Sequence, residues 1–275
     1  MTLPPDDPSA GTATSDPFEP DFSPDPDEPP RLELWATVGD VPPWGSVLVL
    51  LACGIVFAAQ AARGEVGDST ALMAWGASLT GASGVDAAWR CLASIFLHGG
   101  AVHLMWNALN LLMFGAAVEA LYARPGFWIV FAGGGGMASA ASLLVRELRG
   151  GASLSVGASG AIFALAGALI VSAVRLRTRL APGRARALGA AMLFLVATSL
   201  AGGAGTQTTD HVAHVAGLLA GAGLGLVAPL SGRLRLPGEA RSTGSGPVGV
   251  VAGVLAAMAL AVSFALAMLR GLSTP

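Results

Sequence analysis

The stretch GASGAIFALAGALIVSA, residues 157–173, decides the fold class of this chain. The polar residue Ser159 lies near its start, and an apolar run follows from Ala161 to Val171. Apolar runs of this kind that recur along a chain are typical of helices that cross a bilayer. A serine at the start of such a helix lies among unpaired backbone N–H groups, where the helix dipole favours a developing negative charge.

The composition of the whole chain indicates a membrane protein. Apolar residues make up 53% of its 275 residues and charged residues only 12%, which is too apolar for an ordinary soluble domain. The fifteen basic residues are all arginines scattered between apolar runs, and the net charge is −2, so a nucleic-acid partner is not expected. Two cysteines, Cys53 in an apolar run and Cys91 in a predicted loop, have neither metal-ligand nor disulfide spacing.

Seven apolar stretches are long enough, or nearly so, to cross a bilayer as helices. They are residues 45–62, 101–122, 126–145, 157–174, 185–203, 211–230 and 247–269. The sequence therefore predicts an all-α membrane protein.

The remaining segments predict a topology. Residues 1–43 are acidic and rich in proline, which indicates a disordered tail and is unlike the basic and then apolar start of a signal peptide. The loops after the second, fourth and sixth stretches hold nine arginines, against four in the other loops. Because arginine-rich loops stay in the cytoplasm, we expect a multi-pass protein of a bacterial plasma membrane, with its N-terminus in the cytoplasm and its C-terminus outside.

Three further segments complete the predicted domain organisation. Residues 44–230 form the predicted six-helix core, which contains a structured outer loop at 63–100 because that loop is too long for a simple turn. Residues 231–246 are a predicted cytoplasmic linker, and residues 247–275 hold the seventh helix and a short C-terminal end.

Placing a polar side chain inside a membrane span costs free energy, so each such residue is a candidate for function. Most of them fall at one depth, near the outer ends of three spans: His103, Asn107 and Asn110; Ser159; and Asp210, His211 and His214. Because Ser159 and His214 enter the bilayer at the same level, we predict that His214 is the general base for Ser159. Glu119, near the cytoplasmic end of the second span, is predicted to be a buried hydrogen-bonding anchor.

A glycine strip follows His214 on the same helical face. Gly217, Gly221 and Gly225 come after it at steps of three and four residues. Such a strip lets a neighbouring helix approach closely, and a hydroxyl must come within about 3 Å of an imidazole nitrogen for general-base catalysis.

Two other polar side chains of the second span share one helical face. His103 and Asn107 are four residues apart and can supply two donors to an oxyanion. Asn110 continues that face but fits a hydrogen bond to a neighbouring helix better. GASG also occurs at residues 81–84, where no base shares the level of Ser83, so we expect a flexible turn there.

Three residues near the predicted site have structural explanations. Asp210, four residues before His214, raises the possibility of a Ser/His/Asp triad, but an aspartate at a helix start is first of all a cap. His211 points about 60° away from His214 on a helical wheel. His98 precedes the second span, and both histidines are expected to be structural or interfacial.

These residues resemble the motifs of the rhomboid family of intramembrane serine proteases. The matching pieces are Trp89-Arg90, His103-Leu104-Met105-Trp106-Asn107, Gly157-Ala158-Ser159-Gly160, and Ala213-His214 with the glycine strip. They occur in the family's order within residues 45–270. The resemblance implies a rhomboid-like bundle of six transmembrane helices plus one additional C-terminal transmembrane helix.

The resemblance also implies an activity and the residues that carry it. The chain would be a serine endopeptidase that cleaves transmembrane segments through a dyad of Ser159 and His214, without a cofactor. His103 and Asn107 would serve the oxyanion. Phe163 stands where the family often has a tyrosine that stacks on the catalytic histidine, so stacking is kept and the hydroxyl is lost. The other implied residues are Gly157, Gly160, Gly217 and Gly221 as supporting residues, and Trp89, Arg90 and Glu119 as structural ones.

Other functions are compatible with parts of the pattern. A catalytically inactive rhomboid-like chaperone or adaptor would also bind transmembrane helices, although such proteins tend to lose the serine or the histidine. A transporter lacks support because no inverted repeat is visible. A zinc protease would need more than His211-Val212-Ala213-His214, which lacks the glutamate of H-E-x-x-H. We expect transmembrane protein substrates and membrane lipid as partners, and no metal.

Overall fold

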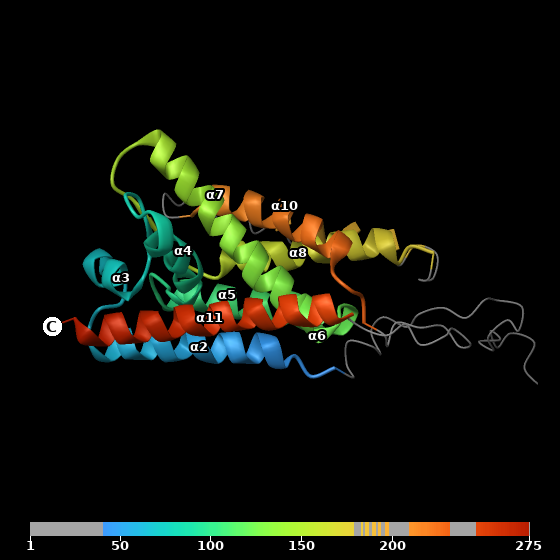
Figure 1. The fold of residues 1–275 in the computed structure, drawn as a ribbon, viewed down its shortest axis with the longest axis horizontal. Coiled ribbons are helices and arrows are strands. Elements are labelled where there is room, and N and C mark those ends of the chain that lie inside the picture. The colour runs from blue at the N-terminus through green and yellow to red at the C-terminus, as the bar shows by residue number, and fades with distance from the viewer. Residues whose placement is uncertain are drawn as a thin grey trace, which may run out of the picture. The chain divides into compact units, whose positions relative to one another are not determined.

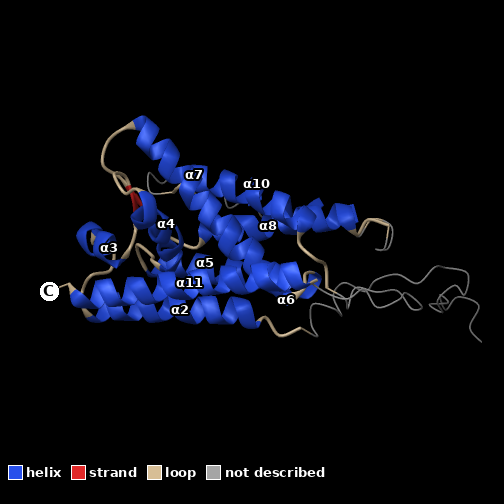
Figure 2. Ribbon diagram, viewed as in Figure 1, coloured by secondary structure: helices blue, strands red, loops and turns tan. Residues whose placement is uncertain are grey.

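Helices account for most of the residues that the computed structural model describes (Figures 1 and 2). These residues are 41–178, 209–231 and 246–274, with isolated positions between 183 and 197. Nearly all of the predicted tail (1–43) and linker (231–246), and more than half of the predicted fifth span (185–203), lie outside them.

In the part of the chain that the structure describes, four helical segments are long and apolar enough to cross a membrane. They are α2 (Trp44–Ala62), α5 (Ala101–Leu121), the segment Arg124–Arg149 and α11 (Pro247–Ser273). The third segment consists of α6 (Arg124–Trp128), the π-helical turn η2 (Ile129–Gly133) and α7 (Gly134–Arg149). The predicted helical membrane protein is therefore confirmed.

The described residues also form two shorter apolar helices, α8 (Ser159–Arg175) and α10 (His211–Val227). Thus six of the seven predicted stretches are helical in the described part of the chain, and the number of spans stays a prediction. Every residue of α8 from Gly160 to Leu169 is buried. A helix that is apolar on all sides belongs in a protein interior, and α8 packs against α5, α7 and α10.

Glycines let α7 approach α8 closely. A methyl group added at Gly134 would overlap the side chain of Ala164, and one added at Gly135 would overlap Ala161. Four consecutive glycines, 133–136, begin this helix. The sequence analysis assigned no role to them, and in the structure they allow α7 to pack on the helix that begins at Ser159.

The outer loop 63–100 contains its own secondary structure. Its elements are α3 (Ser69–Trp75), β1 (Ser78–Leu79), α4 (Gly84–Ala93) and the 3₁₀ turn η1 (Ser94–Phe96). The strand β1 pairs antiparallel with β2 (Leu154–Ser155), just before α8, as Figure 2 shows beside α4. This small sheet was not predicted. The placement of Cys91 in a loop was wrong, because Cys91 is buried in α4, whose amphipathic sequence turns it inward.

Candidate active site

Ser159 and His214, which are distant in sequence, meet at the starts of two helices. Ser159 is the first residue of α8, and His214 lies in the first turn of α10. The Ser159 Oγ atom is 2.8 Å from the His214 Nε2 atom, which is a hydrogen-bond distance. A serine hydroxyl so placed can transfer its proton to the imidazole.

Contact between the two helices depends on their glycines. A methyl group added at Gly217 would overlap the carbonyl oxygen of Gly160, and one added at Gly221 would overlap that of Ala164. Gly167 of α8 meets the carbonyl oxygen of Leu218 in the same way. The close packing predicted from the glycine strip is confirmed, and it brings the backbones of α8 and α10 into contact.

Phe163 lies against the face of the His214 ring. The two ring centroids are 4.3 Å apart and the ring planes differ by 7°, which is a stacked geometry. Phe163 is one helical turn after Ser159, so one face of α8 presents both the hydroxyl and the stacking ring. The expected stacking is present without a tyrosine hydroxyl.

His103 and Asn107 lie beside the segment that leads into Ser159. A methyl group added at Gly157 would come within 2.8 Å of the His103 ring and 3.7 Å of Asn107 Nδ2. Gly157 also has a φ of 121°, so two constraints favour glycine here. Asn107 Nδ2 donates to the His103 carbonyl oxygen at 3.1 Å and retains a second amide hydrogen for another acceptor.

Asp210 caps α10, as predicted, and does not bond the His214 ring. Its Oδ1 accepts the backbone N–H of Ala213 at 3.0 Å. Its Oδ2 accepts the hydroxyls of Ser142 and Ser155. His214 Nδ1 has no hydrogen-bond partner among the described residues. The described geometry is therefore that of a serine–histidine pair, and Asp210 has other partners.

The two remaining histidines lie at the edge of this arrangement. His211 is exposed and its ring is 6.1 Å from that of His214, edge to face. His98 is fully buried, and its ring centroid lies 5.1 Å from that of His103. Within the described ranges, no three histidine, cysteine, aspartate or glutamate side chains are grouped closely enough to hold a metal.

Comparison with known proteins shows which family the chain belongs to. A model of the rhomboid domain matches residues 85–230, which is just over half of the chain and includes Ser159 and His214. The chain belongs to the rhomboid family. Helices α2 and α11 lie outside the match.

Individual relatives come from bacteria and plants. The chain is 31% identical over 154 residues to rhomboid protease GluP of Bacillus subtilis, across 56% of this chain and 29% of that protein. It is 37% identical over 141 residues to RHOMBOID-like protein 2 of Arabidopsis thaliana, across 50% of this chain and 42% of that protein. RHOMBOID-like protein 6, mitochondrial, also of Arabidopsis thaliana, is 34% identical over 141 residues, across 50% and 43% of the two chains. The chain thus spans less than half the length of these relatives.

The outer loop of this rhomboid is held by Trp89 and Arg90. The Arg90 guanidinium donates to the carbonyl oxygens of Met73 and Ala77 and to Asp86, so it caps backbone carbonyls. The Trp89 indole N–H donates to Asp86 at 2.9 Å. Together these bonds lower the pKa of the Asp86 carboxyl, with the indole contributing first and Arg90 after it.

The extra helix α11 reaches this loop from outside the rhomboid match. The Arg270 guanidinium lies 4.9 Å from the centre of the Trp89 ring, on which Arg90 also packs. A methyl group added at Gly271 would overlap the Trp75 ring. The C-terminal end of α11 is therefore packed on α3 and α4.

Glu119 is the buried anchor that the sequence predicted. Its carboxylate accepts the backbone N–H groups of Gly45 and Ser46, each at 2.8 Å, and the Ser46 hydroxyl at 2.7 Å. Those groups begin α2, where backbone donors have no partner within the helix. Glu119 thus ties the start of α2 to the end of α5.

Two other predicted positions lie apart from the Ser159–His214 contact. Ser83 is exposed and immediately precedes α4. Asn110 Nδ2 donates to the Trp106 carbonyl oxygen of its own helix, rather than to a neighbouring helix as expected.

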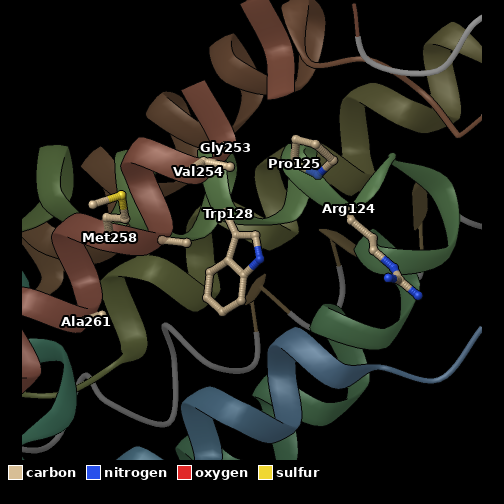
Figure 3. A pocket seen from close by; sticks show the side chains of 8 residues that line it. Arg124, Pro125, Trp128, Gly253, Val254, Met258 and Ala261 are labelled. Carbon is tan, nitrogen blue, oxygen red and sulfur yellow. The ribbon is translucent and has the colours of Figure 1, made fainter. Parts of the chain in front are cut away.

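A groove of about 450 Å³ lies between α6 and α11, where Trp128 lies between Arg124 and Met258 in the view of Figure 3. Its lining contains none of the predicted site residues.

The sequence analysis missed the polar network around Asp210. Arg146 Nε donates to Ser142 Oγ, and the Arg146 guanidinium also donates to Ser78 and to the Ser153 carbonyl oxygen. The available signal was a charged residue, Arg146, directly after the predicted span 126–145.

Proposed function

We propose that this rhomboid is an intramembrane serine endopeptidase that cleaves transmembrane segments of other membrane proteins. The observation that carries the proposal is the 2.8 Å contact between Ser159 Oγ and His214 Nε2 at the starts of two apolar helices. An imidazole at this distance can activate a serine hydroxyl. The similarity to a protein named a rhomboid protease, GluP, supports the same function.

The reaction proceeds through an acyl-enzyme. His214 Nε2 accepts the Ser159 proton while Oγ forms a bond to the scissile carbonyl carbon. The carbon–nitrogen bond then breaks, and the proton passes from His214 to the leaving amine. Water next gives a proton to His214 and attacks the ester, which releases the new carboxyl end and restores the Ser159 hydroxyl. This cycle requires the His214 tautomer that carries its proton on Nδ1.

The negative charge of the tetrahedral intermediate needs donors near Ser159. The backbone N–H of Ser159, at the start of α8, supplies one. The His103 ring and the second amide hydrogen of Asn107 supply the others, and their position against Gly157 supports this role. Loss of one such donor typically lowers turnover by about 10²- to 10³-fold.

The supporting residues act by position. Gly160, Gly217 and Gly221 permit the close contact of α8 and α10, and Phe163 holds the plane of the His214 ring. Outside the site, Trp89, Arg90 and Glu119 stabilise the outer loop and the start of α2, in structural roles.

The helix directions support a core of six spans plus one. α8 and α10 run parallel, because Ser159 meets His214 at their starts and Arg175 at the end of α8 donates to the Gly225 carbonyl oxygen near the end of α10. The chain must therefore return between these helices, where residues 185–203 are predicted to span. We propose the topology given by the arginines, with the N-terminus in the cytoplasm, the C-terminus outside and the protein in a bacterial plasma membrane.

A second candidate function is binding of transmembrane helices without cleavage, as a chaperone or adaptor. Family membership alone is compatible with it, whereas the Ser159–His214 distance favours catalysis. The deciding experiment incubates purified full-length protein in detergent with a single-span model substrate, beside Ser159→Ala, His214→Ala and Ser83→Ala variants. We expect cleavage by the unaltered protein and Ser83→Ala, and none by the other two. Substrate that is bound and left uncut by the unaltered protein favours the second function.

A further inference from the structure

The carboxylate of Asp210 connects three segments around the Ser159–His214 contact. Its Oδ2 accepts the hydroxyl of Ser155 at 2.6 Å and that of Ser142, which lies in α7. Its Oδ1 accepts the Ala213 N–H at the start of α10. Asp210 is thus bonded to α7, to the segment that leads into α8, and to the helix that carries His214.

Each segment that Asp210 joins is close to the reacting atoms. Ser155 belongs to β2 and precedes Ser159 by four residues. His214 follows Asp210 by one helical turn, and its backbone N–H donates to the Asp210 carbonyl oxygen at 3.1 Å. A change in the position of Asp210 therefore moves the start of the His214 helix relative to the segment before Ser159.

The network around Asp210 is itself anchored. Arg146 Nε donates to Ser142 Oγ at 3.3 Å, and its Nη1 donates to the carbonyl oxygens of Ser78 and Ser153. Ser78 pairs with Ser155 in the two-stranded sheet. The strand that carries Ser155 is consequently paired with Ser78, which is itself bonded to Arg146 of α7. Such a support limits the motion of a residue that must stay within hydrogen-bond reach of its partner.

We propose that Asp210 is a positioning residue, which holds the His214 helix and the segment before Ser159 in the register at which Nε2 reaches Oγ. Asp210 acts through the Ser155 hydroxyl and not through a bond to the His214 ring, whose Nδ1 has no partner among the described residues. The inference rests on the proposed function, because the register matters only if Ser159 is the nucleophile.

Variants can distinguish two roles of Asp210, which are the N-cap of α10 and the hydrogen bond to Ser155 in the segment before Ser159. Asp210→Ser keeps a good N-cap for α10, but its side chain is too short to bond Ser155. Ser155→Ala removes the donor of the same hydrogen bond and leaves the cap of α10 intact. Ser155→Thr keeps the hydroxyl, and Ser153→Ala is a matched control on the same segment, because Ser153 enters the network through its backbone.

The test measures the rate of labelling by a fluorophosphonate, the values of kcat and KM for a model transmembrane substrate, and the unfolding temperature. We expect Asp210→Ser and Ser155→Ala to lower the labelling rate and kcat by about ten- to a hundredfold with little change in KM, because misplacement by a fraction of an ångström to one ångström has effects of this size. The double variant should be no slower than Asp210→Ser alone, because both changes remove one interaction. Ser155→Thr and Ser153→Ala should label at the rate of the unaltered protein.

Three results would overturn the inference. One is labelling of Ser155→Ala at the unaltered rate. Another is a double variant whose fold-loss of labelling rate equals the product of the two single losses. Either result shows that the Asp210–Ser155 hydrogen bond does not position Ser159 and His214. A fall in kcat that follows the loss of folded protein in every variant assigns Asp210 to stability alone. Failure of the unaltered protein to label at Ser159 is a different outcome, because it removes the proposed function and this inference with it.

Discussion

Stacking on Phe163 is the contact that fixes the plane of the His214 ring. The rings are 4.3 Å apart and nearly parallel, while His214 Nδ1 has no partner among the described residues. A serine–histidine pair without a third hydrogen-bonding side chain depends on packing to orient its base. We therefore expect the aromatic face to matter at this position and a phenolic hydroxyl to be dispensable.

We predict that Phe163→Ala lowers kcat by about tenfold, the equivalent of an aromatic contact of about 1.4 kcal/mol. Phe163→Tyr keeps the stacked ring and should cleave nearly as fast as the unaltered protein. Steady-state cleavage of a model transmembrane substrate measures both. Equal kcat values for Phe163→Ala and the unaltered protein would show that stacking does not orient His214.

Sequence reasoning located the contact between Ser159 and His214, because both residues interrupt apolar stretches at one predicted depth. It also identified the Asp210 cap and the Glu119 anchor, since each is a charged residue at a helix end. It did not find the bonds from Ser142 and Ser155 to Asp210, which join residues 68 and 55 positions apart. Serine is common in helices and loops, so its partners emerge only when the chain is folded.

At the scale of elements, the contact of α8 with α10 brings Ser159 and His214 together. Gly217 and Gly221 of α10 face carbonyl oxygens of α8, and α7 packs on both of these helices, with Gly134 and Gly135 against α8. The α10 strip was predictable from its spacing after a polar residue. The glycines of α7 had no such marker, so their partner could not be identified from the sequence.

We predict that Gly221→Ala destabilises the protein by about 1–3 kcal/mol, because the added methyl group overlaps the Ala164 carbonyl oxygen and forces the helices apart. Gly223→Ala is the matched control, since nothing lies within 4 Å of the added group on the same helix. It should be neutral or stabilising, because alanine favours a helix by up to about 1 kcal/mol over glycine. Thermal unfolding and fluorophosphonate labelling should both fall for Gly221→Ala only. Equal stability of the two variants would contradict close packing as the basis of the contact.

At the scale of the whole molecule, α2 and α11 run in the same direction in the view of Figure 1. Arg63, after the end of α2, donates to the Thr274 carbonyl oxygen after the end of α11. Both helices therefore end on the same side, as the predicted count of spans requires.

We predict that this side is the outer one. In a protein with both native cysteines replaced by alanine, Ser273→Cys should react with a membrane-impermeant maleimide in intact cells. Thr178→Cys, in the segment after α8, should react only after the membrane is permeabilised. Both residues are exposed in the structure. The reverse pattern would invert the topology and place the Ser159–His214 contact near the cytoplasm.

The central claim is that Ser159 is a nucleophile activated by His214, and active-site labelling tests it most directly. Full-length protein is treated with a fluorophosphonate, and the modified residue is identified by mass spectrometry. We expect modification at Ser159, retained in Ser83→Ala and abolished in Ser159→Ala and His214→Ala, with all variants folded. Modification that persists in His214→Ala at the unaltered rate, or that occurs at a residue other than Ser159, would contradict it.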